Sequence, residues 1–269
     1  MNTAHEAIAQ HTTGRTAVAP WAADPYADAL RAGRGPLFLR RTDGWLLPLE
    51  VERWCARADA VDREVLTRCE GAVLDVGCGP GRLVVELAAS GRAALGIDVS
   101  EAAVDRTNRR GGQALRRSVF EPLPGEGRWG TVLLLDGNLG IGGDPPALLG
   151  RLARLLLPGG LLIAETVPVD VDELASVRIV RTADLTGAGG VRGTAGAPFP
   201  WARLGTPALL RCARARGWHA VGQWAAGGRA FVALRSRSTS SSAEPPNSTA
   251  VISNHLAAKP SPDSPATDR

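Results

Sequence analysis

Three glycines at alternate positions follow an apolar stretch that carries an acidic residue. The acid is Asp75, and the glycines are Gly77, Gly79 and Gly81. Glycine at every second position lets the backbone turn sharply and approach a ligand closely, because no Cβ stands in the way. A second acid, Asp98, ends another apolar stretch about one helix length later, where a carboxylate suits a ribose diol. These residues predict a site for a nucleotide-type ligand.

A strand, a tight loop, a helix and a second strand are needed to position these residues. Apolar residues at 73–76 and 94–97 indicate two buried strands, and residues 83–89 have the apolar period of a helix. This alternation is typical of an open, doubly wound sheet, in which ligands lie across the carboxyl ends of the strands. The glycine loop and Asp98 are therefore expected at the same edge of one sheet.

The motif LDVGCGPGR, followed by GIDVS at the second strand, resembles the class I S-adenosylmethionine-dependent methyltransferases. Its glycine spacing, D-x-G-x-G-x-G, differs from the G-x-G-x-x-G of dinucleotide-binding folds. The resemblance covers roughly residues 70–235. It implies S-adenosyl-L-methionine as the cofactor, with the glycine loop under its methionine part and Asp98 hydrogen-bonded to the ribose hydroxyls.

Two later strand ends extend the resemblance. A strand predicted at 114–119 ends in Val119 and Phe120, which the resemblance places at the adenine, with Glu121 where an aspartate is commoner. A strand predicted at 131–135 ends in a polar loop that the resemblance places beside the transferable methyl group. The cofactor-binding residues that we expect are Asp75, Gly77, Cys78, Gly79, Gly81, Asp98, Val99, Val119, Phe120, Asp136, Gly137 and Asn138.

Purely structural explanations exist for the same residues. The glycines could form only a tight strand-to-helix turn, and Asp98 could assist helix capping beside Ser100. Cys78 and Phe120 could fill the core. The polar loop after residue 135 could be an Asx-type turn.

The order of strands and helices predicts a doubly wound, mostly parallel seven-stranded α/β sheet that ends in an antiparallel hairpin. A Pro-Gly-Gly turn at 158–160 before the fifth strand fits the same family. Half of the residues in the C-terminal tail are serine, threonine or proline, which predicts disorder. We expect four parts: a flexible arm at 1–22, a cap segment at 23–69, the S-adenosylmethionine-binding domain at 70–235 and the disordered tail at 236–269.

Two segments are expected to face the methyl acceptor. The cap segment contains a hairpin turn at Asp43-Gly44 and a helix predicted from 49 to 69. The stretch at 166–205 is longer than a plain connection and contains aromatic residues. After it, Thr206-Pro207 is predicted to cap and begin the next helix. Aromatic and apolar side chains in these segments favour a small organic acceptor.

No catalytic base and no metal site are predicted. Holding an acceptor in line with the S-methyl bond in a dry pocket can accelerate methyl transfer without a dedicated base. If the acceptor is a hydroxyl group, Asp136, Glu165 and His219 are the polar candidates for taking its proton. The four cysteines show no C-x-x-C spacing, which favours reduced thiols over zinc or disulfides.

Composition restricts the class of substrate and the location that we expect for the protein. The net charge of +4 comes from arginines spread along the 269 residues, and no RNA-binding motif is present, so a small-molecule substrate is expected and nucleic acid is not. Without a signal-like start or a long apolar run, we expect a cytoplasmic protein that does not bind membranes. An NAD-dependent oxidoreductase and a non-catalytic S-adenosylmethionine-binding scaffold remain alternatives, and the oligomeric state is not predicted.

Overall fold

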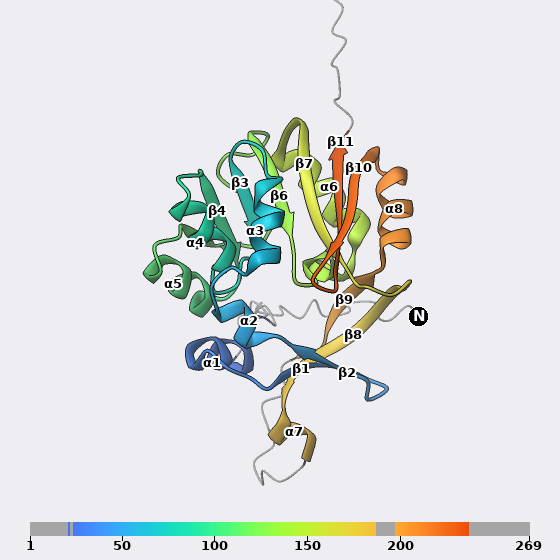
Figure 1. Cartoon of the computed structure of the whole chain (residues 1–269). Helices are drawn as coiled ribbons and strands as arrows, with labels where there is room; N and C mark the ends of the chain where they lie inside the picture. Colours follow the sequence, from blue (N-terminus) through green and yellow to red (C-terminus); the bar gives the residue numbers. More distant parts are fainter. Residues whose placement is uncertain (1–20, 22–23, 187–196, 237–269) are drawn as a thin grey trace, which may run out of the picture. The chain divides into compact units, whose positions relative to one another are not determined.

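The computed structural model describes Trp21 and residues 24–186 and 197–236, which belong to one structural unit (Figure 1). Apart from Trp21 and Ser236, the predicted arm and tail lie outside the described residues. The predicted boundaries after residues 22, 69 and 235 remain predictions. None of the described helices combines the length and apolar character needed to cross a membrane.

A seven-stranded sheet in the order β10-β11-β7-β6-β3-β4-β5 forms the centre of this unit. β11 is antiparallel to both of its neighbours, whereas the pairs among β3 to β7 are parallel. This arrangement confirms the predicted mostly parallel sheet with a terminal antiparallel hairpin. The strands are β3 (Val73–Val76), β4 (Ala94–Asp98), β5 (Ala114–Arg116), β6 (Trp129–Leu134), β7 (Leu156–Thr166), β10 (Trp218–Ala226) and β11 (Arg229–Ser236).

Helices cover both faces of this sheet because alternate strand residues point to opposite sides. In β7, Leu162 and Ala164 belong to one buried cluster with the apolar residues of α6 and α8. Leu161 and Ile163 belong to a second cluster with those of α3 and α4. The helices are α3 (Ala60–Thr67), α4 (Arg82–Ala89), α5 (Glu101–Arg109), α6 (Pro145–Leu155) and α8 (Thr206–Ala215).

A second, antiparallel sheet in the order β2-β1-β8-β9 joins the cap segment to the stretch at 166–205. The predicted hairpin turn at Asp43-Gly44 is confirmed, since it connects β1 and β2. The pairing of β1 with β8 was not predicted. The elements are α1 (Asp24–Ala32), β1 (Leu37–Arg41), β2 (Leu46–Leu49), α2 (Val51–Cys55), the 3-10 segment η2 (Asn138–Gly143), β8 (Asp172–Arg181), α7 (Thr182–Thr186) and β9 (Phe199–Leu204).

The prediction of one helix from 49 to 69 is wrong. Leu49 ends β2, and the helical residues that follow are divided between α2 and α3. Ala56 has extended backbone angles, so the first helix stops there. Asp59 then begins α3 with a capping box, because its side chain accepts from the Asp62 N–H while Asp62 accepts from the Asp59 N–H. This break places Asp62 at the start of a new helix.

Three other predicted boundaries also need correction. The strand predicted to reach Val119 ends at Arg116. The Pro-Gly-Gly turn lies inside β7, which starts at Leu156 and shifts its register against β6 there. Thr206 is the first residue of α8 and not its cap, which is Gly205. The Thr206 hydroxyl instead makes a 2.8 Å hydrogen bond with that of Thr166.

Candidate functional site

A cavity of about 210 Å³ lies where the carboxyl ends of β3, β4 and β6 meet the second sheet. Ligands of doubly wound folds bind at this edge of the sheet. Three of the predicted cofactor-binding residues, Asp75, Gly81 and Phe120, do not line the cavity. The predicted residues that do line it are Gly77, Cys78, Gly79, Asp98, Val99, Val119, Asp136, Gly137 and Asn138.

The glycine loop has a backbone that other residues adopt only with strain. Gly77, Gly79 and Gly81 have φ angles of +71°, +53° and +81°. A Cβ on Gly81 would lie 2.3 Å from Oγ1 of Thr107, so this glycine allows α4 and α5 to pack closely. A Cβ on Gly79 would lie 3.6 Å from the hydroxyl of Tyr26, inside the cavity wall. The three glycines therefore do different things, and Gly81 acts through packing.

Asn138 connects the loop after β6 to the glycine loop. Its Nδ2 donates to the carbonyl oxygens of Val76 and Gly77 over 2.8 and 3.0 Å. A Cβ on Gly77 would lie only 2.7 Å from that Nδ2. The alternative of an Asx-type turn does not describe this geometry, because the amide group of Asn138 spans from one strand end to another. Asn138 thus orders two neighbouring edges of the cavity.

Asp98 braces the glycine loop and also lines the cavity. Its Oδ2 accepts from the N–H of Gly79 over 2.9 Å, and its Oδ1 accepts from the N–H of Ser100 over 2.8 Å. Ser100 itself caps α5 by accepting from the N–H of Ala103. Burial raises the pKa of Asp98 to about 6, although the backbone N–H groups oppose this shift. Each carboxylate oxygen has a second lone pair that a ligand hydroxyl can use.

Neither Asp75 nor Phe120 lines the cavity, but Asp75 is buried whereas Phe120 is exposed to solvent. Asp75 is only 2% exposed, and no described residue forms a hydrogen bond with its Oδ2. Burial, partly offset by Arg82, raises the pKa of Asp75 to about 7. Phe120 is 46% exposed and lies next to Gly142. The core position considered for Phe120 is therefore wrong, and Asp75 is a buried acid beneath the loop.

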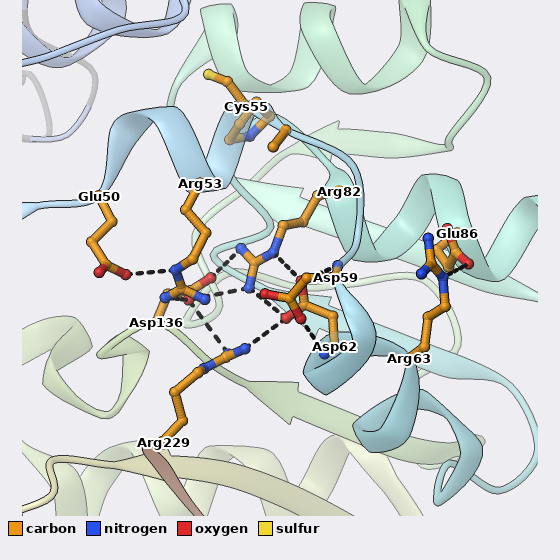
Figure 2. Close-up of polar contacts among 12 residues, drawn as sticks. Glu50, Arg53, Cys55, Asp59, Asp62, Arg63, Arg82, Glu86, Asp136 and Arg229 are labelled. Atoms are coloured by element: carbon orange, nitrogen blue, oxygen red, sulfur yellow. Dashed lines mark hydrogen bonds and ion pairs between the residues drawn. The ribbon is translucent and has the colours of Figure 1, made fainter. Parts of the chain in front are cut away.

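A ring of ion pairs and hydrogen bonds holds the loop after β6, and Figure 2 shows four of its members, Asp62, Arg82, Asp136 and Arg229. Arg82 donates to both oxygens of Asp62 over 2.8 and 3.0 Å, and it also pairs with Asp136. The N–H of Asp136 donates to Glu165 over 2.8 Å. Arg229 closes the ring by pairing with Glu165 and Asp62, each over 2.8 Å. We call these five residues the ion-pair ring.

Asp136 is the strained member of the ion-pair ring. Its φ of +56° lies in the left-handed region, where residues with a Cβ are uncommon. Arg53 of α2 adds a 2.6 Å contact to its Oδ1 (Figure 2). Burial alone would raise the pKa of Asp136, but Arg82, Arg53 and Arg229 outweigh it and hold the pKa below its usual range. The carboxylate is therefore anchored, charged and a poor proton acceptor.

The opposite wall of the cavity is apolar and comes from Trp21, the cap segment, η2 and β9. Trp45 and Phe199, two aromatic residues from these segments, do not line the cavity. Trp201 belongs to the stretch at 166–205, which was expected to face the acceptor, and it does line the cavity. The residues of this wall are Trp21, Tyr26, Leu39, Leu47, Leu49, Trp54, Ile141 and Trp201.

A comparison with protein families identifies the domain. The model of a methyltransferase domain family matches residues 50–199, which is more than half of the chain. The chain belongs to this methyltransferase family. The resemblance to class I S-adenosylmethionine-dependent methyltransferases is thus confirmed, and the oxidoreductase alternative is disfavoured.

Solved structures share the fold of this methyltransferase at low sequence identity. An S-adenosylmethionine-dependent methyltransferase from Bacteroides fragilis, in complex with S-adenosyl-L-homocysteine, has 20% identity and a TM-score of 0.62, and the match covers 78% of this chain and 92% of that one. The glycopeptide N-methyltransferase MtfA, also with S-adenosyl-L-homocysteine, has 16% identity and a TM-score of 0.50 over 67% and 90%. No curated protein matches the sequence.

The three base candidates of the methyltransferase lie in different places. Asp136 lines the cavity, but its arginine partners weaken it as a base. Glu165 is clamped by Arg229 and does not line the cavity. His219 is exposed on β10, also outside the cavity lining. None of the three is therefore both exposed to the cavity and free to accept a proton.

Sequence reasoning missed the arginines and Asp62 that anchor the methyltransferase site. Arg82 directly follows the last glycine of the loop, and this position was a signal that could have identified it. Arg53 and Asp136 are 83 residues apart, and Asp62 and Arg229 are 167 apart. No local sequence pattern marks pairs at such separations.

Proposed function

We propose that this methyltransferase transfers a methyl group from S-adenosyl-L-methionine to a small-molecule acceptor. The observation that carries the proposal is the two-sided cavity. The glycine loop and Asp98 form one side, and the apolar wall forms the other. A cofactor that spans the strand ends would therefore face an acceptor held beneath the second sheet. The ligand in the Bacteroides fragilis relative, which shares the fold, supports this choice of cofactor.

The predicted residues receive separate roles in this proposal. Asp98 binds the ribose hydroxyls, Val119 lies against the adenine, and Gly77 and Gly79 pass under the methionine part. Asn138 and the neighbouring loop form the methionine end. The nine predicted residues that line the cavity contact the cofactor. Asp75 and Gly81 support the glycine loop from behind or beside it, and Phe120 has no role at the cofactor.

The acceptor and the location are also part of the proposal. Leucine, isoleucine and tryptophan side chains dominate the acceptor wall, which suits a compact organic molecule better than a nucleic acid backbone. All four cysteines, Cys55, Cys69, Cys78 and Cys212, are free thiols, which suits the cytoplasm.

Calorimetric titration with S-adenosyl-L-homocysteine tests the cofactor site. Asp98→Ala should weaken binding more than tenfold, because a buried carboxylate beside the glycine loop is lost. Asp28→Ala is the matched control, since Asp28 is exposed on α1 and does not line the cavity. Equal affinity of the wild type and Asp98→Ala would exclude the ribose assignment.

Product formation separates an enzyme from a non-catalytic scaffold. The protein is incubated with S-adenosyl-L-methionine and either cell extract or buffer, and S-adenosyl-L-homocysteine is measured by mass spectrometry. An enzyme should form it with extract and not with buffer, with the Asp98→Ala variant as the background. Tight cofactor binding with no turnover in any extract would favour the scaffold.

A further inference from the structure

Four aromatic rings from four separate segments meet at the acceptor side of the cavity. The ring centroid of Trp21 lies 5.1 Å from that of Tyr26, in an edge-to-face arrangement, and 5.2 Å from that of Trp201. Tyr26 lies 6.4 Å from Trp54, also edge-to-face. All four line the cavity, and we call them the aromatic wall. Aromatic rings favour such offset or edge contacts with a further ring, so this wall presents suitable faces and edges to a planar aromatic ligand.

Tyr26 places a polar atom in this apolar surface. The residue is 5% exposed, and among the described residues its hydroxyl has no hydrogen-bond partner. The hydroxyl faces the glycine loop, 3.6 Å from where a Cβ on Gly79 would lie. The hydroxyl is not among the fully buried unpaired atoms and opens onto the cavity. It therefore lies at the boundary between the glycine-loop side and the apolar wall, where an acceptor atom held next to the cofactor can be its hydrogen-bond partner.

The charges around the cavity favour a neutral ligand there. Asp136 is balanced by Arg82 and Arg53, and Asp98 is held by two backbone N–H groups. Burial and then the charge of Asp98 raise the pKa of Tyr26, so its hydroxyl stays protonated and can donate. An anionic ligand against the tryptophan and leucine side chains would lose its hydration without an ionic partner beside it, since Arg117, a further cation of the lining, directly follows β5 on the sheet side of the cavity.

We propose that the methyl acceptor is a neutral, planar aromatic molecule that lies against the aromatic wall and accepts a hydrogen bond from Tyr26. The inference rests on the proposed function, because it assumes that the cofactor occupies the glycine-loop side of the cavity. Tyr26 is then the residue that sets the orientation of the acceptor relative to the cofactor. The apolar ring of the acceptor would supply most of the affinity, and the hydrogen bond would supply the selectivity.

Binding of defined probes to the protein saturated with S-adenosyl-L-homocysteine tests this inference. The probes are 2-naphthol, its saturated analogue decahydro-2-naphthol, and 2-naphthoate, which carries a charge. Calorimetry should give a dissociation constant for 2-naphthol at least tenfold lower than for either comparison probe. Tyr26→Phe keeps the ring and should weaken 2-naphthol binding about fivefold, as expected for one lost hydrogen bond. Trp201→Leu should weaken it further.

The control variant is Trp45→Leu, which removes an aromatic side chain that lies between β1 and β2 and does not line the cavity. It should leave 2-naphthol binding unchanged. S-adenosyl-L-homocysteine binding shows that each variant is folded. If this cofactor product binds but 2-naphthol binds no better than the saturated or charged probe, the acceptor inference is overturned and the proposed function stands. If the cofactor product does not bind, the proposed function fails and the inference fails with it.

Discussion

The loss of the Asp62 charge should destabilise the fold more than the loss of a surface ion pair. Its side chain is 1% exposed and accepts from Arg82 at 2.8 and 3.0 Å and from Arg229 at 2.8 Å. Asp62→Asn keeps the shape but leaves the guanidinium groups of Arg82, which is buried, and Arg229, which is 12% exposed, with less compensating charge. Removing one partner of a buried ion pair costs about 3–5 kcal/mol. We therefore expect a loss of about 3 kcal/mol, since the asparagine oxygen can still accept one hydrogen bond.

Urea unfolding of matched variants measures this effect. With a slope of about 2–3 kcal/mol per molar urea, the midpoint of Asp62→Asn should fall by about 1–1.5 M. Asp28→Asn is the control, because Asp28 also pairs with two arginines, Arg31 and Arg181, but is 49% exposed. Exposed pairs contribute about 1 kcal/mol or less. Equal midpoints for the two variants would refute the reasoning that burial makes the Asp62 pairs important.

The pH dependence of this difference has a defined sign. Burial alone would raise the pKa of Asp62, but Arg82 and Arg229 outweigh it and hold the pKa well below its usual range. A lowered folded-state pKa contributes stability that is present above the unfolded value of about 3.9 and is lost as pH falls through the folded value. The difference in free energy of unfolding between the wild type and Asp62→Asn should therefore be constant near pH 7 and become smaller below about pH 4.

Three further results are expected at the cavity edge. Because burial raises the pKa of Asp75 to about 7, the wild type should lose stability relative to Asp75→Asn as pH rises from about 4 to 7, measured by urea unfolding. With the pKa of Asp98 raised to about 6, calorimetry should show S-adenosyl-L-homocysteine affinity falling as pH drops through 6. Gly77→Ala, whose Cβ would displace Asn138, should weaken that binding more than tenfold, whereas Gly91→Ala, with the same positive φ and open space, should not. A flat pH profile or equal glycine variants would contradict these expectations.

The parts of the site that could be predicted from sequence are those with local patterns. The glycine loop needs positive φ angles at alternate positions, and only glycine adopts these readily. Asp98 is the last residue of an apolar strand, which places it at the same sheet edge. Asp136 and Asn138 follow another strand of the same sheet. The direction of the strands and the spacing of the glycines and strand-end polar residues are therefore enough to predict one side of the cavity from the sequence.

The other side depends on contacts that local patterns do not encode. β1 pairs with β8 so that Leu37 lies opposite Arg181, and both strands look like ordinary short alternating segments in the sequence. Their pairing brings the cap segment over the strand ends. The helix predicted from 49 to 69 failed for a related reason, because the apolar periodicity continues while Asp59 and Asp62 form a new helix start. The hydrogen bonds of the capping box therefore begin a new helix at a point where the apolar periodicity alone predicts that one helix continues.

Asp136 links the two sides of the cavity. Its backbone belongs to the loop that we assign to the methionine end of the cofactor, and its carboxylate holds Arg53 of the cap segment and Arg82 beside the glycine loop. The left-handed backbone of Asp136 is unfavourable by itself, so these contacts are needed to maintain it. The cost of this backbone geometry is thus offset by ion pairs that also fix the cap. A change that weakens the ion-pair ring should therefore affect cofactor binding and acceptor binding together, although Asp62 touches neither ligand position.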